Sequence, residues 1–229
     1  MATKKETGID IRPLREEAVE FEIVGRTPLI LHNFSEKARR EMLEKQMKAN
    51  GGKAKHEAKV PVNDFINSLY WLTPQPADGK DNDEAWANFE KAVAEGARWG
   101  FRVSGIKQSI IMGAMRAGLD VKGTELKGNL LIEGTAPGST FDLAAIEGPA
   151  PTMREDMVRL AGPSRVADVR HRAEFATWRI PLRMTYDASG KYSIEQLLNC
   201  VNYGGRYCGI GEWRPDKDGQ FGMYALAIS

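Results

Sequence analysis

The sequence has few of the residues from which catalytic and metal sites are usually built. It contains two cysteines, Cys200 and Cys208, and three histidines, His32, His56 and His171. The histidines fall in different predicted elements, and none has the spacing of a metal-ligand set. A Gly-x-Ser-x-Gly elbow, a Walker loop and a Cys-x-x-Cys pair are also absent. We therefore predict no catalytic residue, metal or cofactor, and lean towards a protein that is not an enzyme.

The chain also lacks an excess of charge and a long apolar run. Its 32 Lys and Arg residues nearly balance 31 Asp and Glu residues, which gives a net charge of +1. Any attraction to nucleic acid must therefore come from local clustering. No apolar run approaches the ~20 residues that a membrane helix needs, and no signal peptide precedes the two cysteines. We expect a soluble, cytoplasmic protein with structural thiols and no membrane partner.

What the sequence does contain is a series of strand and helix patterns. A length of 229 residues favours one domain with large insertions. We predict a flexible arm over residues 1–15 and a single domain over 16–229. Within that domain we expect a helical insertion at about 50–96 and a long irregular loop at about 148–172.

Strands are predicted where side chains alternate, and helices where apolar residues repeat every three to four positions. The fold class that follows is α+β, with an antiparallel sheet and helices in two ferredoxin-like halves. In chain order, the predicted elements are strand 18–24, apolar stretch 29–31, helix 35–49, helices 62–72 and 84–96, strand 99–103, helix 105–117, strands 126–133 and 141–146 around a hairpin turn at 136–138, strand 175–186, helix 194–203 after a capping box, and strand 221–228.

Three local patterns make sharper predictions. Small residues on one face of the helix at 105–117, such as Gly113 and Ala114, would let it lie close against a sheet. Pro181 lacks an amide donor, which favours an edge or bulged strand. Gly204 and Gly205 are expected to end the last helix.

The segment from residue 154 to residue 183 is rich in arginine. It holds seven arginines, no lysine and four acids; the arginines are Arg154, Arg159, Arg165, Arg170, Arg172, Arg179 and Arg183. Guanidinium groups bind phosphate through two parallel hydrogen bonds and stack on bases. Arg179 and Arg183 share one strand face about 13 Å apart, a separation that would span two phosphates. The alternative is pairing within the protein, with Glu174 and Asp168 as partners.

The last two dozen residues contain glycine pairs between a predicted helix and the final strand. Gly-x-Gly after a helix is the reverse of a dinucleotide fingerprint, where the glycines open a helix. Such pairs would let backbone amides approach a phosphodiester, while Tyr207 or Trp213 stacks on a base. Arg206, Arg214 and Lys217 supply positive charge. The alternative is a glycine-rich turn with Trp213 buried and Arg214 bonded to a carbonyl.

This ending resembles the glycine-rich loop of the RAMP superfamily, the ferredoxin-like RNA-binding proteins of CRISPR ribonucleoproteins. Gly209 and Gly211 match its first half; Gly219 and Gly222 match its second half with one extra residue between them. Residues 193–228 also resemble the ending of small proteins encoded by bacteriophages. The resemblance covers about a sixth of the chain and carries over no catalytic residue. It implies nucleic-acid binding at these glycines, at Arg206 and at Arg214, with oligomerisation along the strand.

The leading hypothesis is thus a phage-encoded, non-enzymatic protein that binds single-stranded RNA or DNA with little sequence specificity. One alternative is a metal-independent endoribonuclease of the same fold, with His171 or Tyr207 as acid or base. The other is a module that binds a host protein complex. The predicted nucleic-acid-binding residues are Arg165, Arg170, Arg172, Arg179, Arg183, Arg206, Gly209, Gly211, Arg214, Lys217, Gly219 and Gly222.

Overall fold

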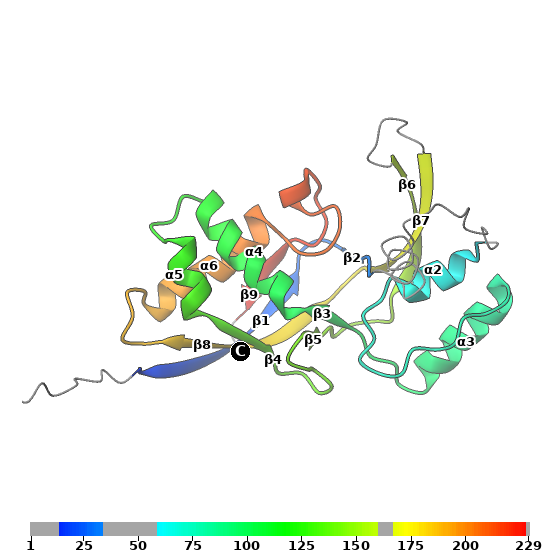
Figure 1. Cartoon of the computed structure of the whole chain (residues 1–229), viewed down its shortest axis with the longest axis horizontal. Coiled ribbons are helices and arrows are strands. Elements are labelled where there is room, and N and C mark those ends of the chain that lie inside the picture. The colour runs from blue at the N-terminus through cyan, green and yellow to red at the C-terminus, as the bar shows by residue number, and fades with distance from the viewer. Residues whose placement is uncertain (1–13, 34–58, 160–166, 228–229) are drawn as a thin grey trace, which may run out of the picture.

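The computed structural model describes residues 14–33, 59–159 and 167–227. Within these ranges the chain is an α+β protein with antiparallel sheets (Figure 1). The predicted helix at 35–49, most of the predicted arm at 1–15, and Arg165 lie outside the described residues. No helix of the described part is long and apolar enough to cross a membrane.

A four-stranded antiparallel sheet forms one end of the molecule. Its strands, in spatial order, are β4 (Leu131–Gly134), β8 (Arg179–Asp187), β1 (Glu16–Gly25) and β9 (Tyr224–Ala227). Two helices pack together beside this sheet, α4 (Val103–Arg116) and α6 (Ile194–Tyr207). Along the chain these elements follow the order β1, α4, β4, β8, α6, β9.

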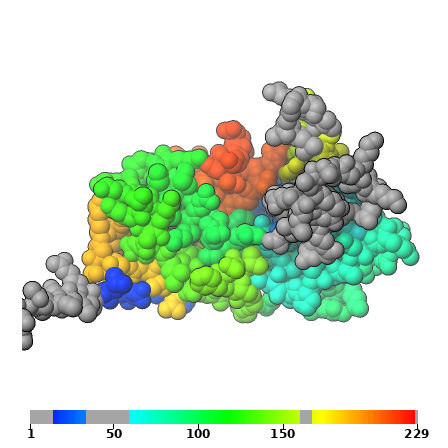
Figure 2. Space-filling model, viewed as in Figure 1, coloured from blue at the N-terminus to red at the C-terminus, as the bar shows by residue number. Residues whose placement is uncertain are grey.

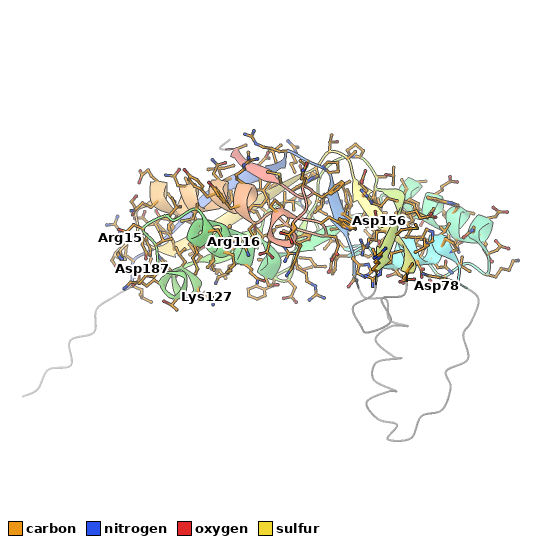
Figure 3. All side chains as sticks on the ribbon, turned by 90° about the horizontal axis from the view of Figure 1, so that it is seen from above. Arg15, Asp78, Arg116, Lys127, Asp156 and Asp187 are labelled. Atoms are coloured by element: carbon orange, nitrogen blue, oxygen red, sulfur yellow. The ribbon has the colours of Figure 1, made fainter. Side chains whose placement is uncertain are left out.

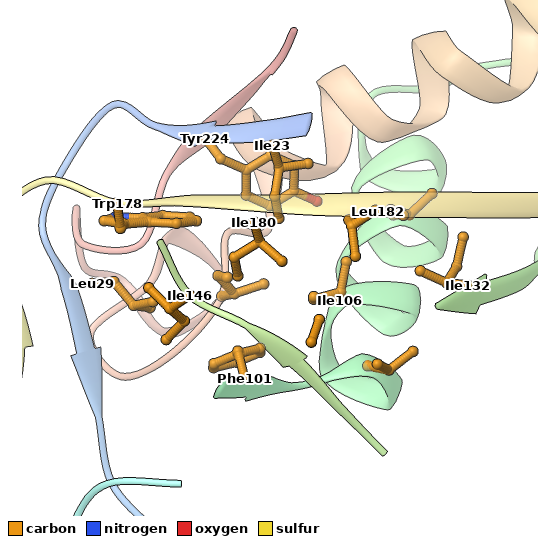
Figure 4. Packing of buried hydrophobic residues seen from close by; sticks show 14 of the residues in the cluster. Ile23, Leu29, Phe101, Ile106, Ile132, Ile146, Trp178, Ile180, Leu182 and Tyr224 are labelled. Atoms are coloured by element: carbon orange, nitrogen blue, oxygen red, sulfur yellow. The ribbon is translucent and has the colours of Figure 1, made fainter. Parts of the chain in front are cut away.

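The core lies between this sheet and its helices, as the strand patterns predict. Phe21 and Ile23 of β1 are buried, while Glu20, which precedes Phe21, is exposed. Ile180 and Leu182 of β8 point into the same core (Figure 4). The predicted capping box also forms, because Ser193 and Gln196 exchange hydrogen bonds at the start of α6.

The small residues of α4 face another helix rather than a sheet, which corrects the prediction. A Cβ atom added at Gly113 would lie 2.4 Å from the Cα atom of Gly204 in α6. Gly204 and Gly205 do not end α6, which continues to Tyr207. A Cβ atom at Gly205 would lie 2.1 Å from the carbonyl oxygen of Tyr224 in β9. These glycines therefore permit close approach to α4 and β9 instead of terminating the helix.

Pro181 lies in an interior strand, not at the predicted edge or bulge. β8 pairs with β1 on one side and β4 on the other. The carbonyl of Pro181 accepts from the amide of Thr135, just beyond the end of β4, at 3.1 Å. Because the N–H and C=O of one strand residue point to the same neighbour, the missing donor lies on this side. No hydrogen bond between β1 and β8 is lost.

Two further elements differ from the prediction between residues 123 and 146. The predicted strand at 126–133 begins as helix α5 (Gly123–Asn129), in which Leu126 is buried. The strand at 141–146 shortens to β5 (Leu143–Ala145), and it pairs with β3 (Gly100–Arg102). The turn at 136–138 therefore does not close a hairpin, because β4 and β5 pair with other strands.

The other end of the molecule holds a second sheet. It consists of β2 (Leu29–Leu31), β7 (Ala167–Phe175) and β6 (Thr152–Arg159), in the order β2-β7-β6. Helices α2 (Pro61–Asn67) and α3 (Asn82–Ala94) lie at the same end. Figure 3 shows the molecule from above, with Asp187 near the end that holds the four-stranded sheet and Asp78 near the end that holds the second sheet.

The predicted irregular loop at about 148–172 is wrong, because this segment holds β6 and most of β7. The two strands pair from Thr152 opposite Glu174 to Arg159 opposite Ala167. We call this pair of strands the hairpin; Figure 1 shows it extending beyond β2 and α2. Charged residues occupy both of its faces, so its sequence carries no apolar alternation.

Two neighbouring stretches of chain connect the two sheets. One runs from β1 into β2, and the other runs from β7 into β8. The two stretches pair along both sheets, β1 with β8 and β2 with β7. At the junction, a Cβ atom on Gly25 would lie 2.3 Å from Nε1 of Trp178. That Nε1 donates to the carbonyl of Thr27 at 2.9 Å. Trp178 therefore fixes the change of direction between the sheets.

Candidate functional site

The glycine loop, defined here as residues 208–223, links α6 to β9 and contains the short 3-10 helix η1 (Pro215–Lys217). Gly209, Gly211 and Gly222 have φ angles of +67°, +77° and +63°, which favour glycine. The loop is attached to β2, because the amide of Glu212 donates to the carbonyl of Ile30 at 3.0 Å.

Close backbone contacts explain the glycines of this loop. A Cβ atom at Gly222 would lie 1.7 Å from the carbonyl oxygen of Ile210, and one at Gly219 would lie 1.7 Å from that of Trp213. At Gly211 the corresponding distance to a carbonyl oxygen of β2 is 2.5 Å. The spacing of the glycines is therefore accounted for by packing within the protein.

The amides of three of these glycines have acceptors within the protein. Gly209 donates to the carbonyl of Gly204 at 2.9 Å, and Gly219 donates to that of Arg214 at 3.1 Å. The amide of Gly222 donates to the carbonyl of Pro28 at 2.8 Å. The predicted contact of these amides with phosphate thus gains no support from their hydrogen bonding.

Arg214 and Asp216 anchor the outer part of the glycine loop. Nη1 of Arg214 donates to the carbonyl of Gly211 at 3.0 Å, as the alternative interpretation expected. Its Nη2 donates to Asp216 at 2.9 Å, and Asp216 also pairs with Arg116 of α4. Burial alone would raise the pKa of the Asp216 carboxyl, but Arg116 and Arg214 outweigh burial and lower it.

Exposed aromatic rings lie at the end of α6 and in the loop that follows. The rings of Tyr203 and Tyr207 stack with centroids 5.9 Å apart and an interplanar angle of 30°. Trp213 is 42% exposed, so the alternative in which it is buried is wrong. Arg206 and Lys217 are also exposed, and neither forms an ion pair within the described part of the chain. We call these five residues the aromatic surface; Figure 2 shows the glycine loop on the outside of the molecule beside α4.

The outer face of the four-stranded sheet is balanced in charge. Arg183 of β8 lies opposite Glu20 of β1 and Glu133 of β4 in the strand register. Arg179 is bound by Glu147, with the Nη2 atom 2.8 Å from the carboxylate. The predicted pair of arginines is therefore surrounded by at least as many carboxylates.

The arginines of the hairpin are largely paired with acids, as the alternative interpretation of this segment expected. Arg172 is only 2% exposed, and its Nη1 lies 3.4 Å from Asp156. Arg170 lies 3.4 Å from Asp168, and Arg154 pairs with both Asp156 and Glu174. Arg159 is exposed near the tip of the hairpin.

The hairpin is the neighbour of the glycine loop. Nη2 of Arg172 lies 3.8 Å from the carboxylate of Glu212 in the loop. The guanidinium of Arg154 lies over the ring of Phe221, 4.8 Å from its centroid. Burial lowers the pKa of Arg172, but arginine remains charged. The loop is therefore fixed by β2 on one side and by the hairpin on another.

His171 and the two cysteines are buried. His171 is 9% exposed, and its Nε2 lies 3.2 Å from the carboxylate of Glu155. Burial raises the pKa of the thiols of Cys200 and Cys208, so both are protonated at neutral pH. A general base must reach the proton that it removes, so the burial of His171 disfavours the catalytic role that the endoribonuclease alternative would give it. Across the described ranges, no group of three or more His, Cys, Asp or Glu side chains is arranged to hold a metal.

The structure thus brings together only part of the predicted site. Arg206, Tyr207, Trp213, Arg214 and Lys217 all belong to the end of α6 or to the glycine loop. The arginines of β8 lie on the outer sheet face, and those of β7 lie in the hairpin.

Three residues were missed in the sequence, namely Tyr203, Arg116 and Glu212. Tyr203 had a detectable signal, since it precedes Tyr207 by one helical turn. Arg116 and Glu212 carry no local signal, because their partners lie far away in the chain. Comparison of the chain with protein-family models and with curated proteins gives no match.

Proposed function

We propose that this chain binds single-stranded nucleic acid without cleaving it, and that the strand lies on the aromatic surface. We further propose that its four-stranded sheet and helices are a ferredoxin-like core of the RAMP type. The observation that carries the proposal is the exposed stack of Tyr203 and Tyr207 on α6, next to Arg206, which is exposed and forms no ion pair within the part of the chain that the structure describes.

The order of the elements supports the proposed core. Two strand-helix-strand units follow each other along the chain, namely β1-α4-β4 and β8-α6-β9. Their strands alternate in one antiparallel sheet, in which β1 and β8 are central and β4 and β9 lie at the edges. The split strand-helix-strand pattern of ferredoxin-like domains has this same order, which supports the proposed core.

The chemistry of the aromatic surface suits a flexible polynucleotide. Bases of any identity stack on exposed aromatic rings, at about 1–3 kcal/mol for each base. Tyr203, Tyr207 and Trp213 supply such rings, and each is more than a third exposed. Arg206 and Lys217 supply the charge that attracts phosphate. Stacking and phosphate contacts together predict binding with little sequence preference.

The proposed position of the nucleic-acid strand differs from the one that the arginine-rich segment at 154–183 favours. Arg179 and Arg183 share their sheet face with several glutamates, and Arg172 is buried in the protein. Cations that are already neutralised by neighbouring acids attract phosphate weakly. Arg206 and Lys217 of the aromatic surface, in contrast, are exposed and form no ion pair within the described ranges, and for this reason we place the nucleic-acid strand there.

Binding is tested with fluorescently labelled single-stranded RNA and DNA of mixed sequence, at low and at moderate salt. We expect both strands to bind, with affinity that falls steeply as salt rises. The double variant Tyr207→Ala/Trp213→Ala should weaken binding about tenfold or more. The matched control is Phe141→Ala, since Phe141 is 72% exposed in the loop between β4 and β5, and it should bind like the parent protein.

Three outcomes would overturn the proposal. Absence of binding at low salt, combined with capture of a protein complex, would favour the interaction module. Equal affinity of the double variant and the parent protein would remove the aromatic surface from the site. Cleavage of RNA that resists chelators and disappears in His171→Ala would favour the endoribonuclease.

A further inference from the structure

A cavity of about 240 Å³ lies between α4 and the glycine loop. Gln108 and Met112, one turn apart on α4, line one wall. Gly209, Gly211 and Arg214 of the glycine loop line the opposite wall. The cavity therefore borders the same loop that carries part of the aromatic surface.

We propose that this cavity receives a single base of the bound strand, turned out from its stacked neighbours. The inference rests on the proposed function and names the part of the strand that the cavity takes. Trp213 lies between Gly211 and Arg214 in the sequence, and both of these line the cavity. A strand stacked on Trp213 thus contacts the same segment, residues 211–214, that forms one wall of the cavity.

The size of the cavity suits one ring system. Its volume of about 240 Å³ is far above the ~10–15 Å³ that one water needs. It is smaller than the ~300–1,000 Å³ of pockets that enclose drug-sized ligands. A base fits this volume, whereas a whole nucleotide with its sugar and phosphate would extend outside.

The walls favour a neutral group over a phosphate. The guanidinium of Arg214 is already held by the carbonyl of Gly211 and by Asp216. The amide of Gly209 donates to a carbonyl of α6. Cys208 also lines the cavity, and burial raises the pKa of its thiol, so it stays uncharged. These walls therefore offer a phosphate no uncommitted cation.

The remaining groups are those that recognise a base. The side-chain amide of Gln108 is exposed and offers both donors and an acceptor, which match the edge of a base. Met112 offers a thioether, which packs well against aromatic rings. Gly209 and Gly211 contribute backbone atoms to the wall of the cavity.

The experiment uses single-stranded oligonucleotides that carry 2-aminopurine, a base whose fluorescence rises when it leaves its stack. Met112→Trp fills the cavity and should abolish the rise in emission, with affinity about tenfold lower because one base loses its contact. Gln108→Leu removes the polar contact and should weaken binding about threefold to tenfold. The matched controls are Met115→Trp, elsewhere on α4, and Gln220→Leu, on an exposed part of the glycine loop; neither residue lines the cavity.

The outcomes separate this inference from the proposed function. One outcome is that oligonucleotides bind tightly to the parent protein with no rise in emission, and bind equally well to Met112→Trp. This outcome would refute binding of a base in the cavity but would still agree with binding at the aromatic surface. A parent protein that binds no strand at low salt would remove both. Circular dichroism melting of each variant checks that the fold is retained. If Met112→Trp unfolds, the emission rise and Gln108→Leu decide the question.

Discussion

The hairpin and the aromatic surface both contain arginine, yet their surroundings differ. Arg172 of the hairpin is 2% exposed and lies between Asp156 and Glu212. Arg206 of the aromatic surface is exposed beside the stacked rings of Tyr203 and Tyr207. The comparison shows that a run of arginines along the sequence does not by itself make a positive surface. The acids placed opposite them in the fold decide what charge remains.

The largest effect should be a loss of stability when Arg172, the buried arginine of the hairpin, is replaced. Arg172→Leu takes from the buried carboxylate of Asp156 one of its two arginine partners, while Arg154 still pairs with it, and we expect the unfolding free energy to fall by about 1–3 kcal/mol. Urea denaturation followed by circular dichroism measures this loss. Arg159→Leu is the control, because Arg159 is exposed in the same hairpin, and it should change stability by less than about 0.5 kcal/mol. A loss below about 1 kcal/mol for Arg172→Leu would show that the hairpin arginines are not structural.

The next largest effect concerns the exposed cations of the aromatic surface and the salt dependence of binding. Arg206→Gln and Lys217→Gln should each reduce the slope of log affinity against log salt by about 0.7 for single strands, because each removes one phosphate contact. The control is Lys91→Gln on α3, at the far end of the molecule and paired with Glu95. Titrations of a labelled strand at several salt concentrations give the slopes. Unchanged slopes in both variants would place the phosphate contacts elsewhere.

A smaller effect should appear at acid pH, where the glycine loop is anchored. Arg116 and Arg214 lower the pKa of folded Asp216 below that of the unfolded chain, which is about 3.9. The ionised carboxylate therefore stabilises the fold above this value, and the contribution is lost as pH falls through the lower folded pKa.

Asp216→Asn should thus be less stable than the parent protein near neutral pH, and the difference should shrink as pH falls below about 4. Urea denaturation at several pH values measures both unfolding free energies. A difference that stays constant across this range would mean that Asp216 acts through its shape and hydrogen bonds, not through its charge.

The smallest effect is expected on the outer sheet face. Arg183→Gln should leave affinity for single strands unchanged within about twofold, because Glu20 and Glu133 flank this arginine. Anisotropy titrations at low salt would detect a larger change. A loss of affinity comparable to that of Arg206→Gln would place the nucleic-acid strand on the outer face of the four-stranded sheet.

The sequence predicts those elements whose signal is local. β1 and β8 alternate clearly, and the capping box at Ser193 sets the start of α6. The hairpin escaped prediction because its strands place arginine and aspartate where alternation would need apolar residues. Gly204 was misinterpreted as a stop because the sequence does not reveal Gly113 beside it. In both cases the missing information is a contact between distant segments.

The candidate site was predictable to a similar extent. The glycine loop, Tyr207, Trp213 and the nearby cations stand out in the sequence. The sequence does not show which of these cations are already paired in the fold. Arg214 is bound by Asp216, whereas Lys217, three residues later, is exposed. The cavity beside α4 was also invisible, since Gln108 and Gly211 meet only in the folded chain.

The place of β1 in the sheet has a consequence for how the protein is made. β1 lies between β8 and β9, and both of these begin at residue 179 or later. During synthesis, at about 5–20 residues per second, the first strand therefore emerges long before either partner. Pairings between such distant segments form slowly. We expect β1 to stay unpaired in the nascent chain until β8 has emerged, and the central sheet to close only after β9 has followed.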